Sequence, residues 1–300
     1  MFNINFIKEN NIIKCVPLNK GWSGDKKYIL KDEVGNKYLL RVSNSSKYEK
    51  RKMQYDYLKQ VETLNINCSK PLEFGVLEDG NNYMVLTYLE GMEAEKEILK
   101  YDELTQYKMG LEAGRMLKGI HSLPIPIQKE SWWDRYKVKM QRKIDALLSC
   151  SYRLLMQEEI IRYYKENAYL MQNRPLVYSH GDYHLGNMII NNGKIGVVDF
   201  DKVNPADPYD EFKPFCWNVM RSEYFETGLI NGYFNNNVPD EFFKILKFYT
   251  AESLISHLPW AVGFGEEEIK IAMEIDSNQM KWYDNFKLDV PTWYKGIIEV

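Results

Sequence analysis

Alternation of apolar and polar residues over the N-terminal third of the chain predicts short strands separated by turns rich in Gly, Asn and Asp. The predicted strands are 12–18, 27–30, 38–42, 72–77 and 83–88. Between the third and fourth strands, residues 46–65 change to helical periodicity, with Met53, Tyr57, Val61 and Leu64 on one face. This region is predicted to form an antiparallel five-stranded sheet with one helix.

The pattern changes after Leu89-Glu90-Gly91, and the rest of the chain is mainly helical. The ranges with helical spacing are 104–123, 132–173 and 212–300. We therefore predict an α+β fold of two lobes. Residues 1–91 would form the sheet lobe with the hinge, and residues 92–300 the helical lobe.

One hairpin is predicted within the helical lobe. Residues 188–198 hold two short runs of Val, Ile and Met around Asn191-Asn192-Gly193, and Asn and Gly tolerate the positive φ angles of a tight turn. A hairpin brings its open ends together, so Asn187 is expected beside Asp199, with Asp182 on a loop at the same end. Carboxylate and amide oxygens are ligands that Mg²⁺ prefers, and a further carboxylate can orient an attacking hydroxyl. These three residues are the predicted centre of a catalytic site.

The same stretch carries a family resemblance. His180-Gly181-Asp182, then Asn187, then Val198-Asp199-Phe200-Asp201 resemble the catalytic and metal-binding loops of the aminoglycoside phosphotransferase family, which is related to choline kinases and protein kinases. The resemblance implies a two-lobed protein-kinase-like fold with a catalytic β-hairpin in a mainly helical C-lobe. It also implies that Asp182 orients the acceptor hydroxyl, while Asn187 and Asp199 hold Mg²⁺ on the phosphates of ATP or GTP. The alternative is a structural hairpin whose flanking polar residues only cap turns.

The resemblance also assigns nucleotide-binding positions in the sheet lobe. The loop 20–25 lies where kinases carry a glycine-rich cover over phosphates, so Ser23 is a predicted phosphate contact. Arg41 takes the place of the kinase lysine that pairs with the α- and β-phosphates, and a surface Arg on an edge strand is the alternative. At the hinge, Tyr88 and Leu89 are predicted to bind the base through their backbone groups.

An acid on the predicted helix is expected to pair with Arg41. Glu49 lies one turn before the apolar face of that helix and is the candidate. The competing interpretation is an exposed acid, since Asp and Glu are favoured in the first turn of a helix. The three basic residues that follow are predicted to face solvent: Lys50, Arg51 and Lys52.

Several histidines and acids are predicted to have structural roles. His121 lies at a helix end, and His180 and His184 flank the predicted catalytic Asp and are expected to brace its loop. Asp207 and Asp210 belong to an acidic, proline-containing element after the hairpin, which the resemblance places in support of the catalytic loop.

Composition and charge restrict the setting. Apolar residues make up 45% of the chain and charged residues 27%, as in soluble globular proteins. A net charge of −3 gives no electrostatic support for a nucleic-acid partner. The 4 cysteines form no C-x-x-C pair, so no zinc or redox site is predicted. Without a secretory signal or a run of about 18 apolar residues, the chain is expected to be cytoplasmic with no membrane partner. A monomer is also expected.

The acceptor is predicted from the uneven distribution of charge. Residues 1–91 hold 14 Lys and Arg against 11 Asp and Glu, whereas residues 201–300 hold 9 against 17, a net charge of −8. An acidic surface in the region that the family uses for its acceptor would attract a polycation, so an aminoglycoside is the favoured acceptor. The candidate contacts, each with a solubilising surface acid as its alternative, are Asp210, Glu223, Glu226, Glu266, Glu267 and Glu268.

Other functions stay open from the sequence. Aromatic residues near those acids also suit a quaternary amine, so a metabolic kinase of choline, amino-alcohol or sugar type is the first alternative. A non-catalytic nucleotide-binding protein is supported only by Arg41 in place of Lys and by the uncertain partner Glu49. A protein acceptor is disfavoured because no Ala-Pro-Glu motif follows Asp199. The favoured hypothesis is a kinase of a small cationic molecule, with antibiotic resistance as the role that an aminoglycoside acceptor implies.

Overall fold

The computed structural model describes residues 2–18 and 24–300, and the chain divides into two compact units. The first unit consists of Met1–Ala94 and Asn187–Val203, and the second of Glu95–Gly186 and Asn204–Val300. This grouping differs from the predicted lobes in two respects: the first boundary lies after Ala94 and not after residue 91, and the hairpin groups with the N-terminal sheet. The loop that carries Asp182 belongs to the second unit.

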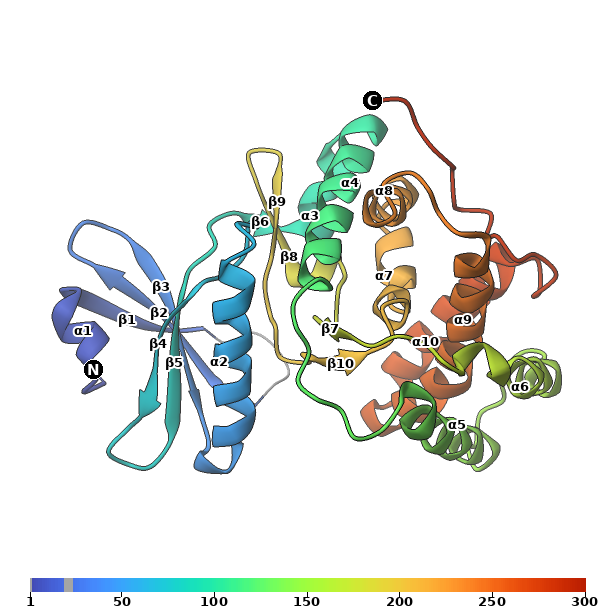
Figure 1. Ribbon diagram of the computed structural model, residues 1–300, viewed down its shortest axis with the longest axis horizontal. Helices are drawn as coiled ribbons and strands as arrows, with labels where there is room; N and C mark the ends of the chain where they lie inside the picture. The colour runs from blue at the N-terminus through green and yellow to red at the C-terminus, as the bar shows by residue number, and fades with distance from the viewer. Residues whose placement is uncertain (1, 19–23) are drawn as a thin grey trace. The chain divides into compact units, whose positions relative to one another are not determined.

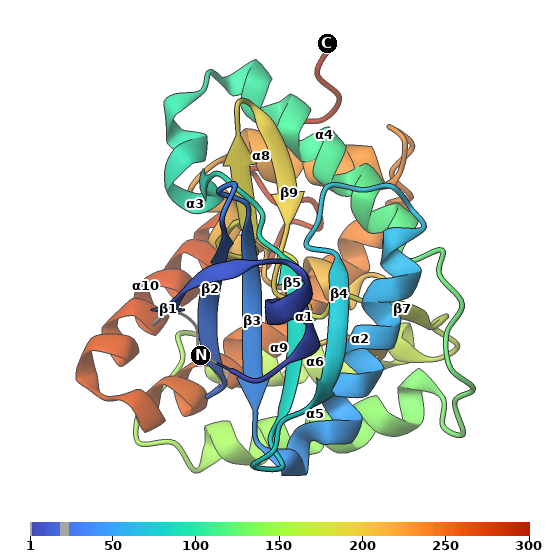
Figure 2. The ribbon, with the colours of Figure 1, turned by 90° about the vertical axis from the view of Figure 1, so that its left-hand side faces the viewer.

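An antiparallel sheet of five strands forms the centre of the first unit, in the order β1-β2-β3-β5-β4 (Figure 2). Its strands are β1 (Ile12–Leu18), β2 (Lys26–Asp32), β3 (Lys37–Ser43), β4 (Pro71–Val76) and β5 (Asn82–Thr87). All five predicted strands are therefore confirmed. In the middle strand β3, Arg41 lies opposite Lys27 on one side and Met84 on the other. The alternative that Arg41 sits on an edge strand is wrong.

Helices cover both faces of this sheet (Figure 1). They are α1 (Asn5–Glu9) and α2 (Tyr48–Glu62), the latter preceded by a 3-10 turn, η1 (Ser45–Lys47). Leu40 and Val42 of β3 belong to an apolar core cluster that includes Phe6 of α1. Because side chains alternate along a strand, Arg41 and Ser43 lie on the opposite face, which α2 covers.

The buried side of α2 differs from the predicted one. Tyr57 and Val61 are buried as predicted, but Met53 is 41% exposed. Arg51 and Gln54 are buried in its place. At its N-terminal end, α2 thus turns polar side chains toward the sheet, where the charged partners described below compensate for their burial.

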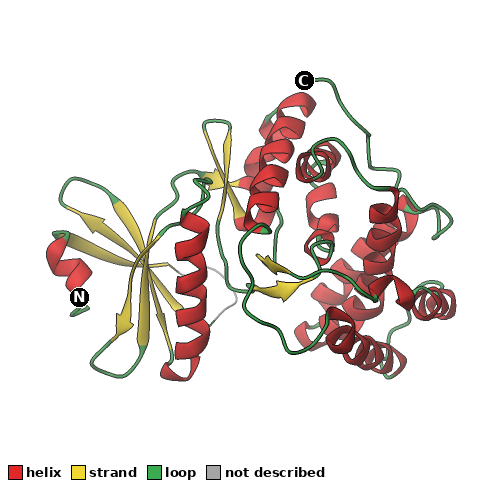
Figure 3. Ribbon diagram, viewed as in Figure 1, coloured by secondary structure: helices red, strands yellow, loops and turns green. Residues whose placement is uncertain are grey.

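The second unit is mainly helical, as predicted (Figure 3). After the short α3 (Ala94–Glu97) and η2 (Ile98–Lys100), its helices are α4 (Glu103–Ile120), α5 (Trp132–Leu148), α6 (Gln157–Glu166), η3 (Ala168–Met171), η5 (Asp210–Phe212), α7 (Phe215–Val219), α8 (Glu223–Tyr233), α9 (Asp240–Ala261), η6 (Val262–Phe264) and α10 (Glu266–Trp282). Two short strands, β7 (Val177–Ser179) and β10 (Asn204–Ala206), pair antiparallel. No helix within residues 2–18 and 24–300 is long and apolar enough to cross a membrane.

The prediction of helix up to residue 300 is wrong for the last segment. Helix α10 ends at Trp282, and Asp284, Asn285 and Phe286 all have positive φ angles, which interrupt a right-handed helix. The remaining chain packs back on the helices: Trp293 is 1% exposed and stacks on Phe215 with ring centroids 5.4 Å apart.

Four glycines allow α4 and α8 to pack backbone against backbone. A Cβ atom added to Gly110 or Gly114 of α4 would lie 2.1 Å from a carbonyl oxygen of α8. A Cβ atom added to Gly228 or Gly232 of α8 would lie 2.2 Å from a carbonyl oxygen of α4. Any side chain at these positions would force the helices apart, so the contact between the two helices depends on glycine.

Candidate active site

The predicted tight hairpin is confirmed. Strand β8 (Met188–Asn191) pairs antiparallel with β9 (Lys194–Val197), and the turn residues Asn192 and Gly193 have φ angles of 50° and 76°. At the open end, the Val198 N–H donates to the Asn187 carbonyl oxygen over 3.0 Å. The backbone of Asn187 is therefore fixed beside the segment that leads into Asp199. A third strand, β6 (Met92–Glu93), pairs with β8 and attaches the hairpin to the chain after the hinge.

Asp199 has the features of a residue held for a ligand. Its φ angle is 63°, a left-handed conformation that costs an L-residue roughly 1–2 kcal/mol. Its Oδ1 atom is buried and accepts no hydrogen bond from any described residue. Its nearest cations are Arg41 Nη1, 3.8 Å from Oδ1, and Lys27 Nζ, 3.9 Å from Oδ2. A buried carboxylate oxygen without a donor fits the hard oxygen donors that Mg²⁺ prefers.

Arg41 lies in a buried charge network. Its Nε donates to Asp25 Oδ2 over 2.8 Å, and its two terminal nitrogens form a bidentate pair with Asp201. Lys47 Nζ lies 2.8 Å from the other oxygen of Asp25. Burial acts to raise the pKa of Asp25, but the hydrogen bonds from Lys47 and Ser43 and the charge of Arg41 outweigh it and lower that pKa to about 2. The Asp25 carboxylate is therefore ionised in the folded protein near neutral pH.

Helix α2 contributes a second arginine to this network. Arg51 pairs with Asp25, donates from Nη1 to Asp201 Oδ1 over 3.1 Å, and donates from Nε to Ser43 Oγ over 3.1 Å. Gln54 Nε2 also donates to Asp201 Oδ1 over 3.0 Å. Two arginines thus face two aspartates, and a neutral amide completes the set.

Two sequence predictions about α2 are corrected by this geometry. Glu49 is exposed and makes no hydrogen bond or ion pair with Arg41 within the described chain, so it is not the partner acid. Arg51 is buried rather than solvated. Both errors have the same cause, since the carboxylates that neutralise Arg41 come from Asp25 and Asp201, far from α2 in sequence. The only sequence signal for Asp201 was its position two residues after Asp199.

Ser23, Tyr88 and Leu89 were also predicted to bind the nucleotide, and the structure does not test that role. Ser23 lies outside the described residues. At the hinge, the Tyr88 N–H donates to the Lys37 carbonyl oxygen over 3.4 Å. The Leu89 side chain packs on the hairpin, because a Cβ atom added to Gly196 would lie 2.7 Å from Leu89 Cδ2.

In the second unit, the loop that carries Asp182 follows β7 and is braced from several directions. Both carboxylate oxygens of Glu211 accept backbone hydrogen bonds, from the His180 N–H and the Gly181 N–H, each over 2.8 Å. The Asp182 N–H donates to His180 Nδ1 over 3.3 Å, and the Tyr183 hydroxyl donates to the Ala113 carbonyl oxygen over 2.7 Å. The Asp182 side chain itself is 28% exposed.

The predicted bracing histidines are confirmed. His180 is fully buried, and His184 Nδ1 accepts from the Gly186 N–H over 3.1 Å. His121 is buried at the end of α4, where Nδ1 lies 2.9 Å from the Tyr233 hydroxyl and Nε2 lies 3.4 Å from Glu211 Oε2. These rings support the loop through their neighbours.

A second brace was missed by the sequence analysis. Asn218 Oδ1 accepts from the Leu185 N–H over 2.7 Å, and Asn218 Nδ2 donates to Glu226 over 2.7 Å. Burial raises the pKa of Glu226 to about 8, because the Asn218 amide offsets only part of the desolvation. Glu226, 1% exposed, is thus a buried brace, and its prediction as an acceptor contact is wrong.

Asp207 has the predicted structural role. It forms a bidentate pair with Arg174, over 2.8 and 3.0 Å, and accepts from the Tyr249 hydroxyl over 2.8 Å. Asp210 pairs with Lys213 over 2.6 Å, which leaves less of its charge for an acceptor.

The other predicted acceptor acids differ in availability. Glu223 forms an ion pair with Lys295. Glu266, Glu267 and Glu268 form the first turn of α10. Shortly before them in the chain lie two exposed aromatic rings, Trp260 and Phe264, with centroids 4.7 Å apart. Acids and aromatic rings together are the groups that bind organic cations.

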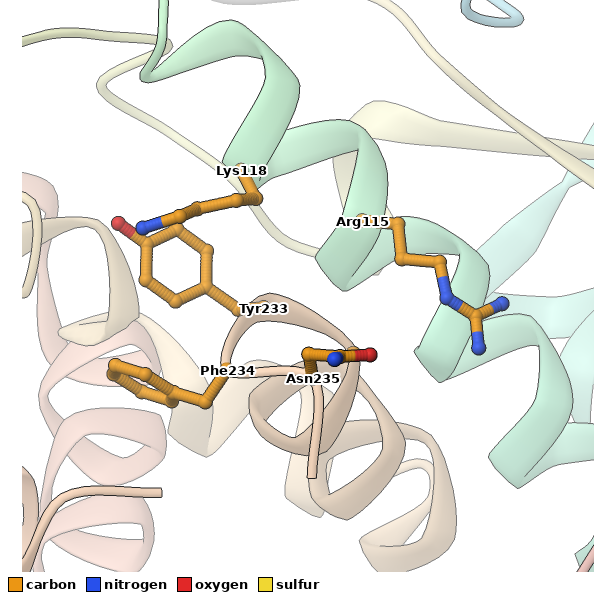
Figure 4. Close-up of a pocket in the computed structure, with 6 residues that line it drawn as sticks. Arg115, Lys118, Tyr233, Phe234 and Asn235 are labelled. Carbon is orange, nitrogen blue, oxygen red and sulfur yellow. The ribbon is translucent and has the colours of Figure 1, made fainter. Parts of the chain in front are cut away.

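A pocket in the second unit lies at the ends of α4 and α8 (Figure 4). It encloses about 360 Å³ and is lined by Arg115, Lys118, Gly232, Tyr233, Phe234 and Asn235. None of the sequence-predicted site residues is in this lining. Two basic side chains are the opposite of what a cationic acceptor requires, so this pocket does not fit the predicted acceptor.

Comparison with known proteins agrees with the predicted family and fold. A model of the phosphotransferase enzyme family matches residues 14–241. The chain belongs to this family and is a kinase-like phosphotransferase. No curated protein sequence matches it.

Solved structures share the fold at low sequence identity. The GDP complex of aminoglycoside 2'-phosphotransferase-IIIa superposes with a TM-score of 0.69 at 13% identity, over 92% of this chain and 96% of that one. An amicoumacin kinase in complex with AMP-PNP and Ca²⁺ has a TM-score of 0.64 at 14% identity, over 95% and 93%. The gentamicin complex of an aminoglycoside 2''-phosphotransferase has a TM-score of 0.63 at 17% identity, over 92% and 97%. The predicted protein-kinase-like fold is thus confirmed.

Proposed function

We propose that this phosphotransferase moves the γ-phosphoryl group of ATP or GTP to a hydroxyl group of a small cationic acceptor. One observation carries the proposal above all others. Asp199 has a left-handed backbone conformation, its buried Oδ1 accepts no hydrogen bond from a described residue, and Arg41 and Lys27 each lie within 4 Å of one of its carboxylate oxygens. A carboxylate held in this way is suited to a metal ion that accompanies phosphate groups.

In this proposal the first unit binds the nucleotide. Asn187 and Asp199 would hold Mg²⁺, which would supply positive charge that neutralises the phosphates. Arg41 and Lys27 supply further positive charge, and the guanidinium of Arg41 is held rigidly by Asp25 and Asp201. Backbone groups of the hinge at residues 88–89 bind the base.

The second unit supplies the group that acts on the acceptor. Asp182 orients the acceptor hydroxyl and accepts its proton as the hydroxyl oxygen bonds to the γ-phosphorus, while the bond from that phosphorus to the bridging oxygen breaks and the nucleoside diphosphate leaves. The loop keeps its shape because Glu211 accepts two backbone hydrogen bonds next to Asp182. Catalysis then rests on positioning and electrostatics, as is general for phosphoryl transfer.

An aminoglycoside is our favoured acceptor. The acids of α10 follow the exposed rings of Trp260 and Phe264, and this combination suits a compound with several amines. Two of the structural neighbours are described with aminoglycoside substrates or names. Inactivation of such a compound in the cytoplasm by a monomeric enzyme is the role that this acceptor implies. A choline-type or amino-alcohol kinase is the second candidate, favoured by the same exposed rings.

A phosphate-transfer assay tests the proposal. Purified protein is incubated with Mg²⁺, ATP or GTP, and a panel of aminoglycosides, choline, ethanolamine, a macrolide and a fructosamine. We expect transfer to an aminoglycoside, and transfer to choline alone would favour the second candidate. The substitution Glu267→Gln with Glu268→Gln should raise KM for a polyamine acceptor several-fold and leave KM for the nucleotide unchanged. Nucleotide binding without transfer to any acceptor would contradict the proposal.

A further inference from the structure

The acid that pairs with Arg41 belongs to the segment that carries Asp199 and not to α2. Asp201 accepts hydrogen bonds from four nitrogen atoms: both terminal nitrogens of Arg41, one of Arg51, and the amide nitrogen of Gln54. The side chain of Asp201 is only 15% exposed. A carboxylate with four hydrogen-bond donors has a defined position. Asp25 holds the other side of the Arg41 guanidinium, where it accepts a hydrogen bond from Nε.

The same carboxylate lies two residues after Asp199. The left-handed conformation of Asp199 persists only if the chain is held on both sides. Before Asp199, the Val198 N–H is bonded to the Asn187 carbonyl oxygen. After it, Phe200 is 2% exposed and packs on Tyr57, with ring centroids 6.1 Å apart, and Asp201 is bound to the arginines. Residues 199–201 therefore carry two carboxylates with different places: Asp199 at the proposed metal site and Asp201 against Arg41.

We propose that Asp201 is a positioning residue that couples Arg41 to Asp199, so that phosphate binding and metal binding depend on one carboxylate. This inference rests on the proposed function. On α2, the neutral Gln54 donates to Asp201 where a second acid would repel it. The arrangement explains why Glu49 is exposed, since the charge of Arg41 is already balanced.

The first test is Asp201→Asn, with the affinity for nucleotide measured by calorimetry at saturating Mg²⁺ and without Mg²⁺. An amide cannot accept two charge-assisted hydrogen bonds from one guanidinium, so Arg41 loses its fixed position. We expect the affinity for nucleotide with Mg²⁺ to fall about tenfold or more, and the gain in affinity that Mg²⁺ provides to shrink. The KM for the acceptor should change by less than about twofold, because no acceptor contact is altered.

A compensating substitution separates positioning from folding. The double variant Gln54→Glu with Asp201→Asn exchanges the amide and the carboxylate of two residues that are joined by a 3.0 Å hydrogen bond. The total charge stays that of the wild type. The double variant should recover a large part of the lost affinity, whereas Gln54→Glu alone places two acids together and should weaken binding. This non-additivity is the sign of a shared site.

The matched control is Asp32→Asn in the same sheet. Asp32 is 5% exposed and accepts from the turn N–H groups of Val34 and Asn36, with no contact to Arg41. It should lower Tm and leave nucleotide affinity unchanged. If Asp201→Asn behaves like this control, or if the folded double variant recovers nothing, the inference is overturned. Wild-type protein that binds nucleotide but transfers no phosphate would refute the proposed function alone, and wild-type protein that binds no nucleotide would refute both.

Discussion

The two units fix the two aspartates that we propose to be functional, Asp199 and Asp182, in different ways. In the first unit, side chains fix the segment that carries Asp199: Phe200 packs on Tyr57, and Asp201 is bound by Arg41 and Arg51. In the second unit, Asp182 is fixed through backbone hydrogen bonds to a buried acid, in a setting of closely packed helices. Opposite charges thus fix side-chain positions in the first unit, whereas a buried acid fixes the backbone of the loop in the second unit.

The largest effect is expected in the helix packing of the second unit. Gly114→Ala places a Cβ atom 2.1 Å from the Leu229 carbonyl oxygen, and a backbone atom cannot move aside. We expect the free energy of unfolding to fall by about 4 kcal/mol, beyond the usual range for overpacking, measured by urea denaturation. The control Gly263→Ala meets no atom within 4 Å and should be nearly neutral. Equal stabilities would show that α4 and α8 are not packed as described.

The next effect tests the charge network of the first unit. Arg51→Met removes a cation from two buried aspartates and should cost about 3 kcal/mol of unfolding free energy. Lys50→Met, one residue earlier on the exposed side of α2, should cost less than about 0.5 kcal/mol. Chemical denaturation of both variants measures these free energies. It shows whether Arg51 is buried, as in the structure, or solvated, as the sequence suggested. Similar values would contradict the network.

Alkaline pH should act on the second unit. The pKa of Glu226 is raised by burial to about 8 in the folded protein, so the unfolded chain releases the proton first as pH rises. Stability from this residue is present below its ordinary pKa and is lost as pH rises toward about 8. Glu226→Gln should remove roughly 3 kcal/mol of the loss between about pH 5 and about pH 9, whereas the partly exposed Glu223→Gln should not. If the stability of Glu226→Gln depends on pH as that of the wild type does, Glu226 is not a buried acid with a raised pKa.

Acidic pH should lower the stability of the first unit, through the protonation of Asp25. The pKa of Asp25 is lowered to about 2 by Lys47, Ser43 and Arg41, against the effect of burial. Its contribution is present above its ordinary pKa and disappears as pH falls toward about 2, on the order of 2 kcal/mol. Thermal unfolding of Asp25→Asn should show a flatter profile below about pH 4, with the exposed Asp56→Asn as the control. An unchanged slope would mean that Asp25 is not paired as described.

The sequence predicted the features that depend on local patterns. Strands β1 to β5 follow from alternation and turn residues, and the hairpin follows from Asn191-Asn192-Gly193. The structural role of His180 followed from its place next to Asp182. Each of these conclusions used residues that are close together in the chain.

Long-range pairing was beyond the sequence patterns. The partner of Arg41 was sought on α2, because helical spacing placed Glu49 near the expected face. Nothing in the pattern shows that Asp201, 160 positions away, neutralises Arg41. Buried acids such as Glu226 could likewise not be distinguished from surface acids, because the residue type alone does not show whether a glutamate is buried. Charged residues were therefore the least predictable part of the site.

The central claim is that Asp199 serves the nucleotide and Asp182 the acceptor. The most direct test compares Asp182→Asn with Asp199→Asn, by calorimetric nucleotide affinity with Mg²⁺ and by phosphate transfer. We predict that Asp182→Asn keeps nucleotide affinity within about threefold while transfer falls by about 10²–10⁴. Asp199→Asn should lose the part of the affinity that depends on Mg²⁺. Undiminished transfer by Asp182→Asn, or wild-type Mg²⁺ dependence in Asp199→Asn, would contradict the account.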